Sequence, residues 1–335
     1  MGGKALKKVE TRRYNLEEYK EASSFIISEL KKILLYSVIS DIPYLREKET
    51  FGDLDVLVSF NTSTDIQSIM QIILNHFQPD EHIKNGKVLT FNYKDLQVDI
   101  VFTPLECFPL SLTYYSWNDA GMLLGRICHY LGLKYGPEYL RLLVLNDNDR
   151  VCDIPLTNDP KIIFSILGLD FEIFKNGFDN YTQLFDFIST SKYFYYDIFD
   201  SALINSASRR RDNKRVSLHL FFEYLTLNQE RWKHSNKKRT QDENIEFIDK
   251  LFPEKFIYNT IAEANRKIEI KRLVSEKWNG NIIMSIIPDL VDSKLGNAIN
   301  KHKEYVKSFD LDFEYYILNN DFDKILNDFK LVNEL

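Results

Sequence analysis

The chain contains 335 residues with a net charge of −6 at neutral pH; 44% of the residues are hydrophobic and 27% are charged. This length is typical of about two domains, and the composition excludes a largely disordered chain. No apolar run approaches the roughly 20 residues that span a bilayer, and the N-terminus has no signal-peptide pattern, so we do not expect a membrane-embedded protein. Three cysteines without a CxxC pair exclude a disulfide framework and favour a cytoplasmic location. The acidic average does not exclude a nucleic-acid partner, because basic residues cluster locally at 4–13, 209–215 and 233–239.

The spacing of apolar residues predicts a small α/β unit in the first half of the chain. In chain order it indicates a helix, a strand, a helix that Thr64 caps, and two strands around a tight turn: 14–37, 55–60, 64–77, 87–93 and 96–102. Residues 118–134 and 160–167 are predicted to be helical, with an irregular link between them. From about Gly177 helical segments dominate. We therefore place a domain boundary near residue 176, between an α/β domain of 1–176 and an α-helical domain of 177–335.

Three aspartates on two of the predicted strands indicate a metal site. Asp53 and Asp55 are two residues apart, so on a strand both side chains point to one face. Asp99 lies within the apolar strand sequence LQVDIVF, where an unpaired charge is costly. Magnesium prefers hard oxygen ligands, and Gly52 would let a triphosphate approach the backbone closely. The pattern predicts a site for two Mg²⁺ or Mn²⁺ ions of the kind used in phosphoryl and nucleotidyl transfer, whereas ordinary surface carboxylates at strand ends are the alternative.

The sequence around these aspartates resembles the active-site signature of the DNA polymerase X family, the relatives of DNA polymerase beta. In that family a run Arg-Gly-x-Glu-x-x-Gly-Asp-x-Asp-Val-Leu holds the triphosphate and two metal-binding aspartates. The matching positions here are Arg46, Glu49, Gly52, Asp53 and Asp55, and Asp99 matches the third aspartate. The resemblance covers about residues 14–175. It implies a palm with a mixed sheet and thumb-like helices, and a metal-dependent nucleotidyltransferase activity in residues 1–176.

Further positions of the family pattern extend this resemblance to the nucleotide. Tyr114 and Tyr115 stand where the family has an aromatic pair against the sugar of the incoming nucleotide, and Asp119 and Arg126 follow at the family's spacing. The segment 154–169 looks like the one that closes the thumb. The resemblance therefore implies that nucleoside triphosphates bind here, with deoxynucleotides preferred because the aromatic pair leaves little room for a 2′-hydroxyl.

Three positions depart from the family pattern. The Gly-Ser pair that opens the signature is replaced by Ile42-Pro43, the Gly after the aromatic pair is replaced by Trp117, and the residue that reads the base edge is Met122. About forty residues precede the signature, without the lyase and helix–hairpin–helix elements that grip template and primer in the family. We therefore expect template-independent synthesis.

The second half of the chain offers two candidate contacts with nucleic acid. A basic loop precedes an aromatic helix at 218–225, and it is predicted to bind a single-stranded product or acceptor through Arg209, Arg210, Arg211, Lys214 and Arg215. The segment from Trp278 to Gly296 is similar to a helical element of tRNA nucleotidyltransferases and bacterial poly(A) polymerases. An ordinary helix–loop–helix packing motif explains that segment equally well.

These observations favour an enzyme that adds deoxynucleotides to a hydroxyl without a template, releases pyrophosphate and makes single-stranded DNA oligomers. The organisation of the chain also resembles the template-free enzymes of Hailong-type bacterial anti-phage systems, in which the enzyme is paired with a membrane effector protein. Two alternatives stay open: a terminal nucleotidyltransferase acting on RNA or tRNA, and a degenerate nucleotide-binding regulatory module. The sequence does not specify the acceptor, the preferred base or the oligomeric state.

Overall fold

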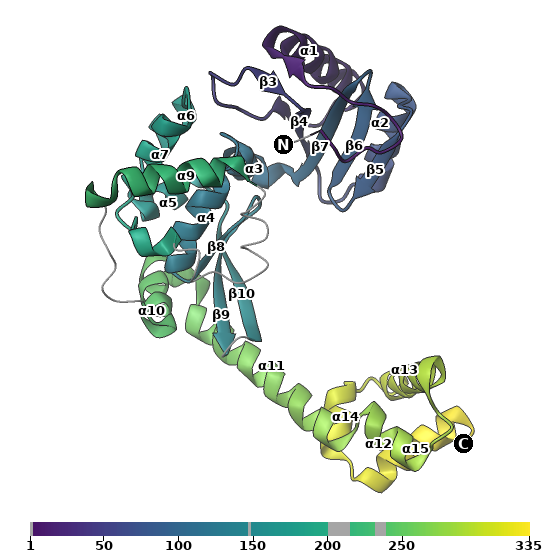
Figure 1. Ribbon diagram of the computed structural model, residues 1–335. Helices are drawn as coiled ribbons and strands as arrows, with labels where there is room; N and C mark the ends of the chain where they lie inside the picture. Colours follow the sequence, from purple (N-terminus) through teal and green to yellow (C-terminus); the bar gives the residue numbers. More distant parts are fainter. Residues whose placement is uncertain (1–2, 147–148, 200–214, 232–238) are drawn as a thin grey trace. The chain divides into compact units, whose positions relative to one another are not determined.

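The computed structural model describes residues 3–146, 149–199, 215–231 and 239–335 (Figure 1). Their contacts divide the chain into two units, which are described separately below. The first comprises Met1–Leu143 with Asp153–Lys255, and the second comprises Val144–Cys152 with Phe256–Leu335. The predicted boundary near residue 176 therefore falls inside the first unit, because the helices that follow it pack against the elements before it.

The first unit consists of groups of strands separated by helices, followed by a run of helices. Its strands are β1 (Tyr14–Asn15), β2 (Ile39–Asp41), β3 (Thr50–Phe51), β4 (Asp53–Phe60), β5 (His82–Asn85), β6 (Val88–Tyr93), β7 (Leu96–Pro104), β8 (Leu133–Tyr135), β9 (Leu140–Asn146) and β10 (Asp149–Thr157), the last two of which extend into the second unit. Its helices are α1 (Leu16–Ile33), α2 (Ile66–Phe77), α3 (Phe108–Tyr115), α4 (Ala120–Tyr130), α5 (Pro160–Leu167), α6 (Phe171–Asn176), α7 (Tyr181–Ser189), α9 (Val216–Leu227) and α10 (Gln241–Leu251).

A five-stranded mixed sheet organises this unit, with the strand order β2-β4-β7-β6-β5. Strands β4 and β7 are parallel neighbours, and the other pairs are antiparallel. The predicted α/β fold class is thereby confirmed. The irregular link expected between residues 134 and 160 is wrong, because β8, β9 and β10 form a separate three-stranded sheet there. Burial alternates along residues 140–144 of β9, although the sequence LRLLV shows no matching alternation of apolar and polar residues.

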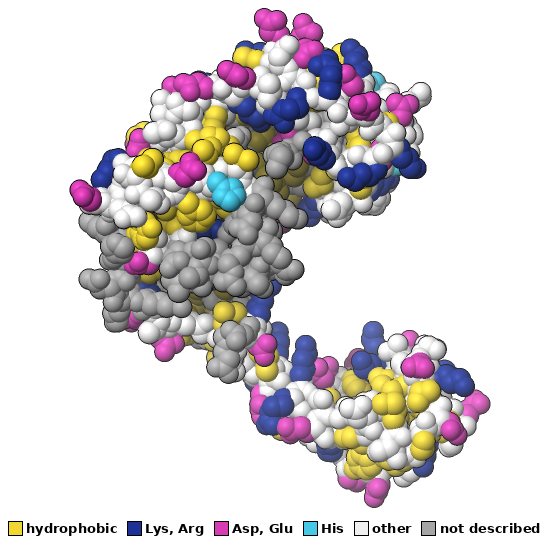
Figure 2. All heavy atoms as spheres, in the orientation of Figure 1, with side chains coloured by type: hydrophobic (Ala, Val, Ile, Leu, Met, Phe, Trp, Pro, Cys, Tyr) yellow, Lys and Arg dark blue, Asp and Glu magenta, His cyan; other side chains and the backbone are white. Residues whose placement is uncertain are grey.

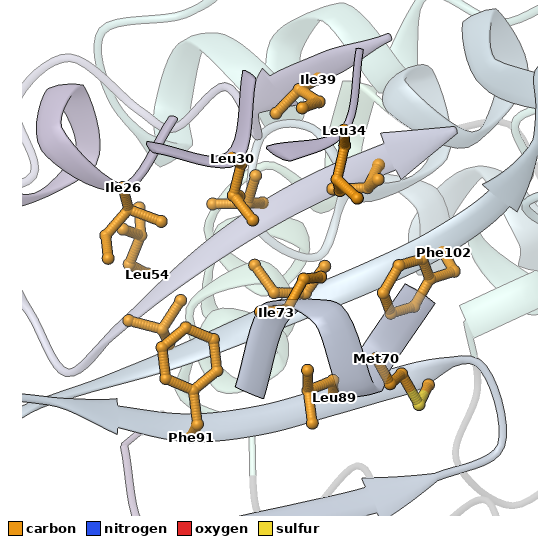
Figure 3. Packing of buried hydrophobic residues seen from close by; sticks show 14 of the residues in the cluster. Ile26, Leu30, Leu34, Ile39, Leu54, Met70, Ile73, Leu89, Phe91 and Phe102 are labelled. Atoms are coloured by element: carbon orange, nitrogen blue, oxygen red, sulfur yellow. The ribbon is translucent and has the colours of Figure 1, made fainter. Parts of the chain in front are cut away.

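Helices α1 and α2 cover one face of the five-stranded sheet (Figure 3). Both helices direct apolar side chains onto alternate residues of the central strands. The fully buried residues of this core include Ile26, Leu30, Leu54, Val56, Met70, Ile73, Leu89, Phe91, Val98 and Ile100. Because side chains alternate along a strand, the odd-numbered residues of β4 and β7 point to the opposite face. Deep on that opposite face Leu57 packs against Ile42 and Phe108, while the beginning of both strands carries polar side chains.

Asparagine and aspartate side chains fix where the first two helices begin. Asn15 caps α1 by accepting from the backbone N–H groups of Glu17 and Glu18, and the Glu18 side chain completes a capping box. The cap of α2 is Asp65, which accepts from the backbone of Gln67 and Ser68. The expectation that Thr64 caps this helix is therefore wrong by one residue, since the aspartate is the side chain that reaches the free N–H groups.

The second unit is helical around its own apolar core. It contains α11 (Ile257–Lys277), α12 (Gly280–Ile286), α13 (Asp292–Ser308), α14 (Phe313–Asn319) and α15 (Phe322–Asn333). Trp278 and Ile283 are buried in this core, so the segment compared with tRNA nucleotidyltransferases acts here as a helix–loop–helix packing element. In the described part of the chain, none of the helices has both the length and the apolar content needed to cross a bilayer.

Candidate active site

The parallel pairing of β4 and β7 brings the three predicted metal ligands together at one end of the sheet. Asp55 lies directly opposite Asp99 in the register of the two strands, and Asp53 lies opposite Gln97. All four side chains belong to the face that α1 and α2 leave uncovered. The sequence spacing predicts that Asp53 and Asp55 share a face, and the tertiary structure adds that Asp99 is their neighbour.

Burial and repulsion by neighbouring carboxylates disfavour the charged forms of Asp55 and Asp99. The pKa of Asp55 is raised to about 7, first by burial and then by the charges of Asp53 and Asp99. Burial also raises the pKa of Asp99, although hydrogen bonds from Thr90 and Gln97 oppose this shift. A buried set of like charges is stable only with compensation, which a divalent cation would supply.

The carboxylate oxygens are suited to a hard cation. Asp99 Oδ1 is buried and accepts no hydrogen bond from the described residues, as expected of an oxygen that awaits a ligand. The side chains are not arranged as a finished cage, since no three His, Cys, Asp or Glu groups within the described ranges are placed to hold a metal. Asp53 Oδ2 instead accepts a hydrogen bond from the backbone N–H of Gly3 at 3.1 Å. A metal would therefore have to displace this bond and draw the oxygens together.

Two residues that the sequence reasoning missed are linked to this group: Gln97 by a hydrogen bond and Lys48 by its charge. Gln97 Nε2 donates to Asp99 Oδ2 at 3.0 Å, and its own Oε1 accepts from the backbone of Ala5 at 2.9 Å. The Lys48 ammonium lies 4.6 Å from the centre of the Phe51 ring. Burial lowers the pKa of Lys48, while the nearby carboxylates of Asp53 and Asp55 oppose this shift. Gln97 could have been found from its spacing of two residues before Asp99, and Lys48 from its place inside the signature.

The aromatic pair of the signature lies at the end of α3, beside the same face of the sheet. Tyr114 and Tyr115 form an edge-to-face pair with ring centres 5.2 Å apart, and Tyr115 packs on the small core of Ile42 and Leu57. The pKa of Tyr115 is raised to about 12, mainly by burial, with smaller contributions from Tyr114, Glu138 and Asp55. Tyr115 is therefore close enough to the carboxylates to feel their charge.

Arg46 is engaged away from the carboxylates. Its guanidinium forms an ion pair with Asp179 at 2.6 Å and donates to the carbonyl of Asn176, and its backbone N–H donates to Phe178. This pair is about half exposed on both sides, so it is worth little to stability. Contact of Arg46 with a triphosphate stays a prediction, and it requires the guanidinium to leave Asp179.

The remaining predicted residues lie around α4. Asp119 precedes this helix, forms an ion pair with Arg215 and accepts from Ser217, so it links α4 to α9. The Arg126 guanidinium lies 5.9 Å from the Phe222 ring centre, also on α9. The other members of the predicted basic loop, Arg209, Arg210, Arg211 and Lys214, lie outside the described residues, so their part in binding nucleic acid stays a prediction.

Two departures from the family signature have structural roles. Trp117 has a φ of 58°, a left-handed conformation that a glycine adopts without strain. Its ring packs against Phe174 and Phe178, and Gly177 leaves the space that this ring occupies. Pro43 accepts a hydrogen bond from the backbone of Trp117 at 2.8 Å. Pro43 and Trp117, which differ from the family pattern, thus hold the signature loop and the start of α4 together.

Comparisons with known proteins include a weak similarity to a solved structure. No protein-family model and no curated protein matches the chain. Among solved structures, the chain is similar to polymerase beta of Leishmania infantum, described as a ternary P/T complex, with a TM-score of 0.39 and 11% sequence identity. The similarity covers 48% of this chain and 74% of that chain. We therefore assign the mixed α/β fold from the sheet topology and take no activity from this similarity.

Proposed function

We propose that the protein is a metal-dependent nucleotidyltransferase that adds deoxynucleotides to a hydroxyl group without a template. The observation that carries this proposal is the register of β4 and β7, which sets Asp55 beside Asp99 with Asp53 two residues away on the same face. Three partly buried carboxylates at one point are costly, and nucleotidyl transfer is a reaction that needs such a group. The oxygen-only ligand set favours Mg²⁺ or Mn²⁺.

In this proposal each residue has a defined part. Asp53, Asp55 and Asp99 would hold two divalent ions, which neutralise negative charge on the reacting phosphate when they are bound. Gln97 would fix the orientation of Asp99 through its hydrogen bond. Tyr115 would lie against the sugar of the nucleotide, and Arg46, once released from Asp179, would contact its phosphates. Lys48 lies near Asp53 and Asp55 and would add positive charge beside the transferred group.

Template independence can be tested directly. The direct test supplies one deoxynucleotide at a time, Mg²⁺ or Mn²⁺ and a single-stranded oligonucleotide, and measures pyrophosphate and product length. Extension without any complementary strand is expected. Extension only with a complementary template would overturn template independence.

The sugar preference separates the DNA reaction from the RNA alternative. A ring held against the 2′ carbon excludes a hydroxyl, and such exclusion is worth tens to hundreds of fold in selectivity. Competition between labelled dATP and ATP should therefore favour dATP, and replacement of Tyr115 by Ala should reduce the preference. Equal incorporation would support an enzyme that acts on RNA ends. Absence of pyrophosphate release from every nucleotide would instead support a nucleotide-binding regulatory module.

A further inference from the structure

Residues 3–13, which we call the N-terminal arm, cross the end of the five-stranded sheet at which the carboxylates lie. The arm begins over β4, where Gly3 donates to Asp53, and crosses β7, where Ala5 donates to Gln97. It reaches Glu81 ahead of β5 and returns past the β6–β7 turn, where the backbone of Arg12 donates to Asp95 at 2.9 Å. The arm thus contacts one predicted metal ligand directly and a second one through Gln97.

The main chain of the arm is held, while its lysine side chains are exposed. The Glu81 carboxylate accepts from three successive backbone N–H groups, those of Lys7, Lys8 and Val9, at 2.7–3.1 Å. These bonds lower the pKa of Glu81, first through the one from Lys7. A carboxylate that binds the backbone in this way fixes the path of the arm, and the nearby charge of Lys8 also acts on it.

The charge of the arm is largely uncompensated. Arg12 is paired with Glu18 and Asp95, so it serves as an anchor. Lys4, Lys7 and Lys8 are exposed, and within the described residues they form no ion pair. Figure 2 shows Lys and Arg side chains gathered on the face where Figure 1 draws the arm. A chain with a net charge of −6 therefore carries a local positive strip beside its carboxylates.

The arm also encloses a cavity of about 420 Å³ next to Asp53. Its lining includes Gly3, Lys4, Lys7, Thr11, Arg13 and Gly52. Two backbones approach closely at its floor, since a Cβ on Gly3 would lie 1.9 Å from the carbonyl oxygen of Gly52. Four basic residues, Lys4, Lys7, Arg12 and Arg13, line this space together with backbone groups, a chemistry that suits phosphate groups.

The position of the arm identifies which phosphates it would bind. In the strand order β2-β4-β7-β6-β5, the signature residues Ile42 and Arg46 follow β2, on one side of β4. The arm begins and ends beside the signature, where Gly3 lies against Gly52 and Arg13 donates to Thr50. Between these points it crosses β7 at Gln97, and the backbone of Lys7 and Lys8 bonds to Glu81 ahead of β5, on the other side of β4. Transfer brings two phosphate-bearing molecules to the carboxylates, and the nucleotide is expected on the signature side. The other side is then available to the strand that supplies the hydroxyl.

We propose that the N-terminal arm binds the backbone phosphates of a single-stranded nucleic-acid acceptor, with Lys4, Lys7 and Lys8 as the principal contacts. This inference rests on the proposed function, because it assigns the acceptor site of that reaction. Lysine binds phosphodiesters as an exposed point charge, so the contact is independent of base sequence and sensitive to salt. The arm places the strand and takes no part in bond making.

The test uses the full-length protein and a fluorescein-labelled (dT)12 oligonucleotide, with binding followed by anisotropy over a range of salt concentrations. The triple variant Lys4→Ala, Lys7→Ala, Lys8→Ala should bind about tenfold more weakly near 0.1 M salt, because up to three phosphate contacts are lost. The slope of log affinity against log salt should become shallower by about 2, at roughly 0.7 per contact on a single strand. Gly3→Ala should weaken binding in the same direction, because the arm must shift away from Gly52.

The control removes the same charge elsewhere. Lys294, Lys301 and Lys307 are exposed on α13 of the second unit, and their replacement by Ala should leave oligonucleotide affinity within twofold of wild type. In turnover, the arm variant should raise the KM for the oligonucleotide and leave the KM for dATP unchanged. A raised KM for dATP with an unchanged KM for the oligonucleotide would overturn the assignment to the acceptor. Equal loss in the arm and control variants would overturn it as well.

Binding is measured without metal or nucleotide, so this inference and the proposed function can fail separately. If the wild-type protein binds (dT)12 through the arm but transfers no nucleotide, the acceptor-binding role of the arm is supported and the proposed enzymatic activity is refuted. Protein that extends oligonucleotides while the arm variant binds them normally would support the enzyme and refute the arm.

Discussion

Both units of the molecule bury ionisable side chains, but the surroundings of these groups differ. In the first unit the partly buried Asp55 lies beside Asp99, and the charges of Asp53 and Asp99 raise the cost of charging Asp55. In the second unit His302 is fully buried, with the rings of Trp278, Phe313 and Phe329 around it. Burial lowers the pKa of His302 to about 4, so its ring is neutral at physiological pH.

The difference teaches when a buried polar group indicates function. His302 avoids the free-energy cost of burying a charge because its ring is neutral, and a neutral ring packs well against the aromatic side chains around it. The carboxylates cannot all lose their charge near neutral pH, and they lie on an open face of the sheet rather than inside a core. A set of like charges that only an added cation can offset is therefore a candidate site, whereas a single neutralised group is part of the packing.

The strongest test of this comparison is Asp55→Asn. If the carboxylates hold divalent ions, this change should lower turnover at least about a thousandfold, which corresponds to roughly 4 kcal/mol of transition-state stabilisation. It should also abolish the rise in melting temperature that Mn²⁺ causes in the wild type. The matched control is Asp41→Asn, an exposed aspartate on the neighbouring strand β2, which should keep both properties. Near-normal turnover of the Asp55 variant would refute the metal assignment.

The packing of Trp117 against Gly177, which holds the signature loop, can be tested with Gly177→Ala. The new Cβ would lie 2.2 Å from the ring of Trp117, and residue 177 has a φ of +84°, so both packing and backbone would be strained. We expect the free energy of unfolding of the first unit to fall by about 3 kcal/mol, measured by urea denaturation. Gly125→Ala is the control, because nothing lies within 4 Å of its Cβ on α4, and a small gain is expected there. Equal effects of the two changes would contradict this packing.

The lowered pKa of His302 predicts that the stability of the second unit depends on pH. Its pKa of about 4 in the folded chain lies below the ordinary value of 6.5, so the unfolded chain binds a proton that the folded chain does not. Stability from this residue is present above about pH 6.5 and is lost as the pH falls toward 4. Between pH 7.5 and 5 the loss should be about 2 kcal/mol. Urea unfolding of wild type and His302→Phe at both pH values isolates this contribution, and identical pH dependence in the two proteins would rule it out.

The smallest effect on stability is expected at the exposed pair Arg46–Asp179. Removing either side chain should change the free energy of unfolding by less than about 1 kcal/mol. If Arg46 contacts the triphosphate, Arg46→Ala should also raise the KM for the nucleotide about tenfold, whereas Asp179→Ala should not. Steady-state kinetics of both variants give the answer. A similar rise in both would mean that Arg46 acts by holding the segment that contains Asp179.

Much of the first unit could be predicted from local pattern. The strands around Asp55 and Asp99 and the helix α5 occupy the predicted positions, because their apolar residues repeat with the period of one element. The short strands β2 and β5 were missed, since three or four residues give too few repeats to detect a period. The separation of the chain near residue 255 was also missed, because it depends on which helices pack on which core.

The sequence by itself determined that this protein has an α/β region with three aspartates of metal-binding type, followed by helices. It did so because side-chain periodicity and the chemistry of carboxylates are local properties. Only the tertiary structure decided that Asp55 and Asp99 are neighbours, that Arg46 is paired with Asp179, and that the arm of residues 3–13 lies against Asp53. These contacts join residues 44 to 133 positions apart. Their formation depends on the burial of whole faces, which no short stretch of sequence contains.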